Sequence, residues 1–183
     1  MTAGYAALAA IVVLVVAVVV SYNRFVAQRH AIDAAWGTVD VELQRRHDLI
    51  PNLVEVVQGY AAHERDVLDR VVSLRAQAVA ADGDPGVGPA GQARVEDDLG
   101  HAVHVVLAVA AAYPDLKASR GFLDLQAQLV ETEDRIAAAR RLYNIGVMHY
   151  NRRVEAVPSN VVAAIAGFAR RELFEASALR AGR

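Results

Sequence analysis

With 183 residues, the chain is long enough for one compact domain and a further short segment. It contains no cysteine, which excludes disulfides, thiolate catalysis and cysteine-based metal sites. The formal net charge is −2, and the arginines are scattered among acidic residues without interleaved aromatics, so no nucleic-acid-binding surface is expected.

Residues 3–20, AGYAALAAIVVLVVAVVV, form an uncharged and mostly apolar run. As a helix they would span about 27 Å, close to the roughly 30 Å hydrocarbon core of a bilayer. Tyr5 and Tyr22 bracket the run, where aromatic side chains favour the membrane interface. A cleaved signal peptide is the alternative, but it needs basic residues before the run and a small-x-small cleavage site after it. No lysine or arginine precedes this run, and VVVSYN at its end is not such a cleavage site. We therefore expect an uncleaved transmembrane anchor over residues 1–22.

The first basic residues of the chain, Arg24 and Arg29, follow the apolar run. By the positive-inside rule, they place the short N-terminus outside and residues 22–183 in the cytoplasm. Arg24 would then lie at the membrane interface together with the two tyrosines. The expected arrangement is a single-pass protein that contacts the lipid bilayer through its N-terminal helix.

Apolar residues recur in steps of three and four along the rest of the chain, and no segment alternates like a strand. The period of 3.5 residues holds over four segments, at about 25–50, 53–78, 95–113 and 122–154. This pattern predicts an all-α fold, with an antiparallel bundle of about four long helices and a short C-terminal helix. The bundle domain is expected over residues 23–176, and residues 177–183 are expected to form a tail.

Prolines and glycines mark the expected ends of these helices. Pro51 in DLIPN favours a tight turn, although the apolar period does not slip there and a kink in one long helix is the alternative. DGDPGVGPAG, residues 82–91, predicts a flexible surface loop. Pro114 and Pro158 are expected to end the third and fourth helices.

A short last helix is expected over about residues 160–176, with Ser159 as its N-cap. It would either cap the bundle or lie at the membrane surface, and its balanced charges favour the cap. Its apolar side would consist of Val161, Ile165, Phe168 and Phe174.

Two histidine-containing motifs have residue types that could bind a metal. His63-Glu64 lacks the second histidine of a helical zinc protease, because Val67 stands at that position. Glu64 falls on the apolar seam, where a carboxylate must either have a polar partner or lie at a solvent-exposed end of the bundle. Asp97 shares a helical face with His101 and His104, but a solvated face is the preferred interpretation. We therefore predict no metal and no cofactor.

The stretch ETEDRIAAARRLYNIGVMHYN, residues 131–151, carries two Tyr-Asn pairs seven residues apart. Seven residues are two helical turns, so both pairs repeat one local environment, with a tyrosine in the seam and an asparagine that can bond to a neighbouring helix. Structural register is the preferred role of this polar ladder, ahead of a partner or ligand surface and of catalysis. Its members are Glu133, Arg140, Tyr143, Asn144, Tyr150 and Asn151. No nucleophile–base set can be identified, so no enzymatic activity is inferred.

Four sequence blocks resemble the LemA family. They are YNRFVAQRHAIDAAWGTVDVELQRRHDLIPNLVEVVQGYAAHE (22–64), YPDLKAS (113–119), FLDLQAQLVETEDRIAAARRLYNIGVMHYN (122–151) and PSNVVAAIAGF (158–168). The resemblance implies a bacterial cell (inner) membrane protein, with a membrane helix followed by a bundle of long helices. It implies no established activity. Some family members are encoded near a membrane-bound metalloprotease, which suggests a membrane protease as a partner.

The matching family motifs add Trp36, Asp40, Arg46, Tyr60 and Glu64 to the candidate interaction residues. One position departs from the family pattern, because Ala111 stands where the family usually has a glutamate two residues before the tyrosine of YPDLKA. A function that depends on that acid would be lost here.

Together these observations favour a membrane-anchored cytoplasmic scaffold or adaptor with an unidentified protein partner. The alternative is a small-ligand sensor, with a pocket between the helices lined by Trp36, Tyr60, Glu64 and Tyr143. A homo-oligomer is also compatible, because seams of this regularity can close between chains.

Overall fold

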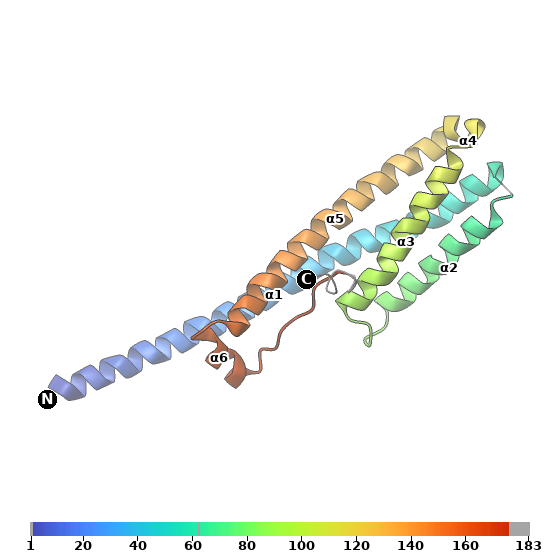
Figure 1. Ribbon diagram of the computed structural model, residues 1–183. Coiled ribbons are helices and arrows are strands. Elements are labelled where there is room, and N and C mark those ends of the chain that lie inside the picture. Colours follow the sequence, from blue (N-terminus) through green and yellow to red (C-terminus); the bar gives the residue numbers. More distant parts are fainter. Residues whose placement is uncertain (1, 62, 176–183) are drawn as a thin grey trace, which may run out of the picture.

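The computed structural model describes residues 2–61 and 63–175, and within these ranges it contains six α-helices and no strand. The helices are α1 Thr2–Tyr60, α2 Arg65–Asp82, α3 Pro89–Ala110, α4 Pro114–Ala118, α5 Arg120–Glu155 and α6 Ser159–Ala166 (Figure 1). The prediction of an all-α fold is confirmed. The expected tail, residues 177–183, lies outside the described ranges.

Helix α1 is unbroken over 59 residues, about 88 Å at 1.5 Å per residue. The turn expected at Pro51 is therefore wrong, since α1 continues through this proline and ends at Tyr60. Proline has no N–H, so the carbonyl of His47, one turn earlier, lacks its usual donor. Nε of Arg75 in α2 donates to that carbonyl at 2.6 Å. A neighbouring side chain thus replaces the missing hydrogen bond.

Helices α1 and α5 lie side by side along most of α5 (Figure 1). The two helices run in opposite directions. Ile32 of α1 lies against Gly146 of α5, whereas Arg46, further along α1, bonds to Glu133, which lies earlier in α5. The glycine allows the close approach of the two helices, since a Cβ at Gly146 would lie 3.3 Å from Cγ1 of Ile32. The first third of α1 extends beyond this pairing (Figure 1).

Helices α2 and α3 pack against each other, and α4 connects α3 to α5 (Figure 1). The connection between α2 and α3 is shorter than the predicted loop of residues 82–91. Asp82 belongs to α2, and residues 89–91 form the start of α3. Pro89 opens α3, because its fixed φ suits the first helical position and its missing N–H is not needed there.

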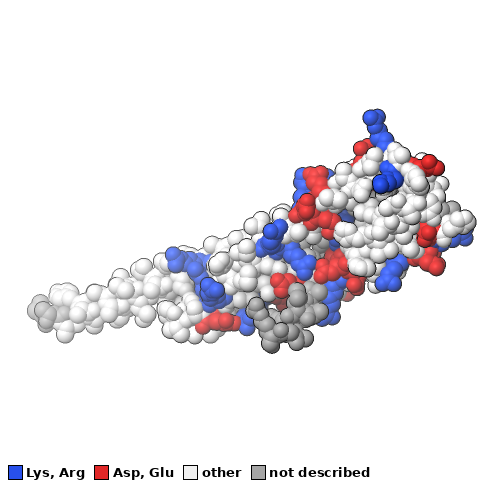
Figure 2. All heavy atoms as spheres, turned by 45° about the horizontal axis from the view of Figure 1, so that its top comes forward, with Lys and Arg blue, Asp and Glu red and all other residues white. Residues whose placement is uncertain are grey.

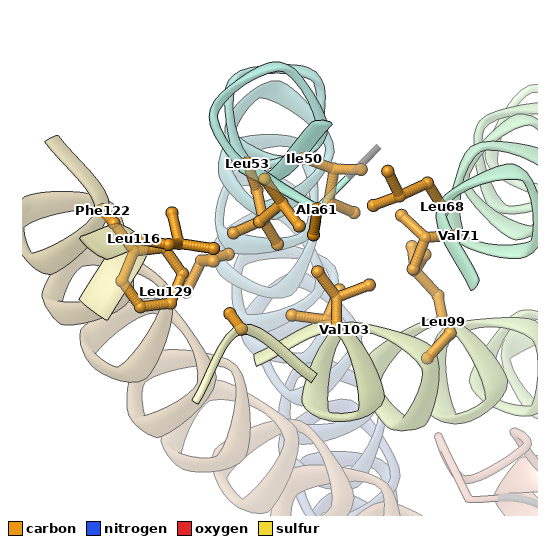
Figure 3. Close-up of a cluster of buried hydrophobic side chains, with 14 of the residues drawn as sticks. Ile50, Leu53, Ala61, Leu68, Val71, Leu99, Val103, Leu116, Phe122 and Leu129 are labelled. Atoms are coloured by element: carbon orange, nitrogen blue, oxygen red, sulfur yellow. The ribbon is translucent and has the colours of Figure 1, made fainter. Parts of the chain in front are cut away.

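Two hydrophobic clusters form the core, and they are named here by their distance from the N-terminal end of α1. The distal cluster takes side chains from α1 to α5 and includes Ile50, Leu53, Leu68, Leu99, Leu116, Phe122 and Leu129 (Figure 3). The proximal cluster includes Phe25, Ile32, Val39, Leu43, Ile136, Tyr143, Val147, Tyr150, Phe168 and Phe174.

The C-terminal part differs from its prediction. Helix α6 ends at Ala166, because Gly167 takes a left-handed conformation with φ 71°. Residues 168–175, here called the C-terminal segment, follow without helical structure and run back towards the α2–α3 connection (Figure 1). Ser159 does not act as the N-cap, since its hydroxyl donates to the carbonyls of Arg153 and Ala156. Of the four apolar residues expected on one side, Phe168 and Phe174 are buried, whereas Val161 and Ile165 are exposed.

Candidate functional site

A buried ionic cluster separates the two hydrophobic clusters. It consists of Arg46 and His47 from α1, Glu96 from α3 and Glu133 from α5. On each helix, the residues before and after it belong to different hydrophobic clusters: Leu43 and Ile50, Ala93 and Leu99, Leu129 and Ile136. The cluster is therefore a polar layer across three helices at one level of the bundle.

Arg46 is the centre of the ionic cluster. Its Nη1 donates to Oε1 of Glu133 at 2.8 Å, and its Nη2 donates to the carboxylate of Glu96 and to the Glu96 carbonyl at 3.0 Å. Nε2 of His47 lies 2.9 Å from the other carboxylate oxygen of Glu96. The side chains of Arg46 and Glu96 are each 3 % exposed, so removing one partner would leave a charge in the core.

Opposing effects act on the charges of this cluster. Burial raises the pKa of Glu96, but the hydrogen bond from His47 and the charge of Arg46 outweigh it, so the pKa lies below its ordinary value. Burial lowers the pKa of Arg46, but Glu133 and Glu96 outweigh it and the net shift is upward. Both groups keep their charges at neutral pH. They are suited to holding three helices together rather than to exchanging protons.

Gly100 of α3 makes room for the Arg46 guanidinium. A Cβ at this position would lie 3.1 Å from Nη1 of Arg46 and 4.0 Å from Oε1 of Glu133. The guanidinium is held on both sides by carboxylates, so it cannot easily move away. The glycine thus allows α3 to approach the ionic cluster.

The two asparagines of the predicted ladder bind the backbone of the C-terminal segment. Asn151 donates to the carbonyl of Arg171 at 2.8 Å and accepts from its N–H at 2.9 Å. Asn144 accepts from the N–H of Phe174 at 2.8 Å and donates to its carbonyl at 3.3 Å. Each side-chain amide therefore satisfies one donor and one acceptor of the segment. The expectation that these asparagines bond to a neighbouring helix is wrong.

Three further ladder or motif residues hold the same segment. The hydroxyl of Tyr143 donates to the carbonyl of Glu172 at 3.0 Å, and Nε of Arg140 donates to that of Phe174 at 2.8 Å. The Trp36 ring packs edge-on against Tyr143 and Phe174, with centroid distances of 5.1 Å and 5.4 Å. We call Trp36, Arg140, Tyr143, Asn144 and Asn151 the segment clamp.

The other ladder members have different surroundings. Glu133 belongs to the ionic cluster, and Tyr150 is buried with its ring edge-on to Phe25 at 5.9 Å. Burial raises the pKa of both Tyr143 and Tyr150, so their hydroxyls stay protonated at neutral pH. The ladder is therefore divided among the ionic cluster, the segment clamp and the proximal hydrophobic cluster.

The predicted pocket of Trp36, Tyr60, Glu64 and Tyr143 does not form. Trp36 and Tyr60 are separated by about 36 Å along α1, and Tyr60 is 50 % exposed. Glu64 instead accepts a hydrogen bond from the Tyr113 hydroxyl at 3.0 Å, near the far end of the bundle. Trp36 and Tyr143 do line a cavity of about 520 Å³, together with Asp33, Arg171, Glu172 and residues of the α2–α3 connection.

Asp40 lies beside Asp82 of α2. Burial raises the pKa of Asp40, and the negative charge of Asp82 raises it further. On the predicted histidine face, Asp97 accepts from Nη1 of Arg140 at 2.8 Å, whereas His101 and His104 are exposed. Within the described ranges, no group of three or more histidine or acidic side chains is arranged to hold a metal ion.

Sequence reasoning missed several residues of these contacts, namely Arg75, His47, Glu96, Arg171 and Phe174 as an anchor of the segment. Glu96 directly follows the seam residue Val95, a position from which a charge can turn inwards. Arg75 lies next to the seam residue Leu74. These positions were visible in the sequence, but nothing in it identified their partners.

The N-terminal third of α1 is long and apolar enough to cross a membrane, and no part of this stretch is buried in the protein. Tyr5 and Tyr22, at its two ends, are 68 % and 46 % exposed. Figure 2 shows this stretch as an uncharged stalk, with charged side chains beginning where it meets the bundle. Among the described helices, this is the single membrane-span candidate.

Over the described residues, an all-α architecture with an N-terminal membrane-span candidate and buried polar contacts between helices defines a class of helical-bundle proteins. Residues 35–182 match the sequence profile of the LemA family, and the chain belongs to this family. The resemblance seen in the sequence is confirmed.

Similar proteins carry two names. Magnetosome protein MamQ 2 of Paramagnetospirillum magneticum is 28 % identical over 186 residues, covering 90 % of this chain and 68 % of the relative. Magnetosome protein MamQ of Magnetospirillum gryphiswaldense is 28 % identical with the same coverage. Protein LemA of Metamycoplasma hominis is 24 % identical over 141 residues, covering 77 % of this chain and 63 % of the relative.

Proposed function

We propose that this LemA-family protein is a membrane-anchored helical scaffold or adaptor without catalytic activity of its own. The observation that carries the proposal is the continuity of α1. One helix contains both the membrane-span candidate and residues of the two hydrophobic clusters. A bundle joined to its anchor by an unbroken helix is held at a defined orientation to the membrane, which is the property that a scaffold needs.

The polar contacts support a structural role. Arg46 is paired with both Glu96 and Glu133, and the asparagines of the segment clamp are hydrogen-bonded to backbone groups of the C-terminal segment. These side chains stabilise one arrangement of an antiparallel bundle and of its C-terminal segment. The internal use of these side chains favours a scaffold over an enzyme.

We propose a single pass through the bacterial cell (inner) membrane, with a short external N-terminus and a cytoplasmic bundle. Arg24 and Arg29 follow the span on the bundle side, and Arg152 and Arg153 at the end of α5 add to the basic charge near the same level. Basic residues next to a span favour the cytoplasmic side.

A partner surface is proposed on the outer face of α5. Leu142, Ile145 and Met148 are 65 %, 46 % and 53 % exposed there, although large apolar side chains favour burial. The face points away from α1, because Tyr143 and Val147 occupy the seam. A membrane protein beside the bundle, such as a membrane protease, is the proposed partner.

Crosslinking in intact membranes, followed by mass spectrometry, tests the adaptor role. Wild type would be compared with a variant carrying Leu142→Ser, Ile145→Ser and Met148→Ser. A control with Leu123→Ser and Val130→Ser changes exposed apolar residues elsewhere on α5. We expect one dominant protein partner that the first variant loses and the control keeps. Self-crosslinks alone, equal in all three proteins, would contradict the adaptor role.

A small-ligand sensor is the second candidate, because the 520 Å³ cavity places Trp36 and Tyr143 on one wall. Trp36 is the only tryptophan in the chain, so its fluorescence reports this cavity alone. Saturable quenching by one metabolite, altered by Tyr143→Phe, would support the sensor. Flat titrations across a metabolite panel would favour the scaffold.

A further inference from the structure

A cleft of about 830 Å³ lies where the apolar stretch of α1 meets the end of α5 and α6. We propose that this cleft binds one anionic phospholipid, with an acyl chain along α1 and the phosphate on arginines, while α6 lies in the membrane interface. This inference rests on the proposed membrane anchor and adds a specific lipid to it. The volume falls in the range typical of small-molecule sites.

One wall of the cleft is a single face of α1. Leu14, Ala17, Val18, Ser21 and Arg24 line it in steps of three and four residues. The face is apolar at Leu14 and Val18 and becomes basic at Arg24, which lies about 9 Å beyond Val18 along the helix axis. A phospholipid has the same order of groups, with its chain in the hydrocarbon and its phosphate at the interface.

The charge of the cleft is complementary to an anionic headgroup. Arg152 and Arg153 of α5 line it together with Arg24, and His149 adds a further nitrogen donor or acceptor. Among the described residues that line the cleft, none is acidic. Guanidinium groups bind phosphate oxygens in a bidentate manner, which favours an anionic phosphate headgroup over an uncharged polar one. Figure 2 shows basic side chains gathered where the uncharged stalk joins the bundle.

Helix α6 provides the independent observation that this region meets lipid. Its sequence SNVVAAIA contains no charge, and Val161 and Ile165 are 57 % and 84 % exposed. Val161 and Ile165 lie one turn apart and form an exposed apolar stripe on α6, and Val157, in the turn before the helix, is 82 % exposed as well. Val161 and Val162 share the cleft with Leu14 and Val18 of the membrane-span candidate. Helix α6 therefore lies at the depth of the membrane interface, where its exposed stripe can enter the lipid.

Lipid retention tests the binding site. The full chain would be reconstituted in phosphatidylcholine nanodiscs containing phosphatidylglycerol, extracted in mild detergent and analysed by native mass spectrometry. Wild type is expected to keep one phosphatidylglycerol per chain. Arg152→Gln with Arg153→Gln should lower this retention at least about tenfold, because two charge-assisted contacts are lost. Arg24→Gln alone should lower it less, and provides a second test if the double variant fails to fold.

Arg65→Gln with Arg70→Gln is the matched control, since it removes the same charge from exposed positions of α2. It should retain lipid as wild type does. Equal retention in both double variants, equal retention of phosphatidylcholine and phosphatidylglycerol, or occupation by a second copy of the chain would overturn the lipid site.

The depth of α6 is tested with single-cysteine labels, which are unique because the chain has no cysteine. A fluorophore on Ile165→Cys should be quenched by spin-labelled lipids, whereas one on Leu142→Cys should not. A label on Leu14→Cys reports the anchor itself. Quenching at residue 14 without quenching at residue 165 would overturn the inference and leave the anchor intact. No quenching at residue 14 would instead contradict the anchor.

Discussion

The guanidinium of Arg75 occupies the place of the hydrogen-bond donor that Pro51 lacks. Its Nε donates to the His47 carbonyl at 2.6 Å, which is the carbonyl that a non-proline residue 51 would bond. A residue of α2 thus allows α1 to remain one helix at its proline. This contact joins the continuity of the anchor helix to the packing of the bundle.

The first prediction concerns this pair. Arg75→Ala should destabilise the protein by about 1–3 kcal/mol, because the carbonyl loses its donor. In a Pro51→Ala background the cost should be smaller, since residue 51 then supplies its own N–H. Thermal unfolding of the full chain in detergent, followed by circular dichroism, measures both. Equal costs in the two backgrounds would contradict the proposed replacement.

The second prediction ranks three glutamates. Glu96→Gln should cost about 3–5 kcal/mol of unfolding free energy, because it leaves the buried Arg46 without one of its partners. Glu133→Gln should cost less, since this side chain is 28 % exposed. Glu131→Gln, which breaks an exposed pair with Arg135, should have the smallest effect of the three, because water screens the pair. An equal effect of all three changes would mean that burial does not matter at the ionic cluster.

The third prediction follows from the lowered pKa of Glu96. A carboxyl with a lower pKa in the folded state stabilises the protein above its unfolded value and loses this contribution as the pH falls through the folded value. Stability should therefore decrease on acidification below the ordinary value of 4.5. Melting temperatures across this range should fall more steeply in wild type than in Glu96→Gln. Parallel curves would count against the coupling of Glu96 to His47 and Arg46.

Asp40 should behave in the opposite way. Burial and the charge of Asp82 raise its pKa, so its ionised form at neutral pH opposes folding. Asp40→Asn should raise the melting temperature at neutral pH, and the gain should shrink in acid, where wild-type Asp40 takes up a proton. Asp48→Asn, at an exposed position of the same helix, is the control. A gain that is independent of pH would exclude the repulsion with Asp82 as its cause.

The fifth prediction concerns the segment clamp. Asn151→Ala and Asn144→Ala each remove a donor and an acceptor of the C-terminal segment, which should cost about 1–3 kcal/mol per site. Because these contacts are local, hydrogen exchange should accelerate at Arg171 and Phe174 and stay unchanged in the distal cluster. Asn52→Ala, at an exposed position of α1, should leave exchange at both sites as in wild type. Exchange accelerated over the whole bundle would contradict a local clamp.

Periodicity predicted the helices and much of the core, because burial of a helical face requires apolar residues in steps of three and four. Phe25, Ile32, Val39, Leu43 and Ile50 fit this period in the first apolar segment and are all buried. Tyr60 fits the same period but is exposed, because the buried side chains at this end of α1 are those of Val57 and Ala61. A repeating pattern gives the approximate face of each helix and does not show where the buried face shifts by one residue.

The polar contacts could be predicted only in part. The repeated Tyr-Asn pairs indicated one environment two turns apart, and both asparagines do make the same two-point contact. The predicted partner of the asparagines, a neighbouring helix, was wrong. Gly167 ends α6 early, and the backbone N–H and C=O groups of the non-helical segment that follows need hydrogen-bond partners. The prediction of a turn at Pro51 was wrong because it, too, left out a contact from a distant part of the chain. Local rules predict the missing hydrogen bond, but a donor from a distant part of the chain compensates for it.

The unbroken α1 is the central claim, and a distance measurement tests it most directly. Spin labels on Asn23→Cys and Gln58→Cys, both exposed positions, would be measured by pulsed electron resonance with the full chain in nanodiscs. Thirty-five residues of continuous helix predict a narrow distribution at about 53 Å. The pair Asn23→Cys and Gln44→Cys, on one side of Pro51, should give about 32 Å in any case. A distance for the first pair that falls near the second would mean that the chain turns back at Pro51, and would contradict the account.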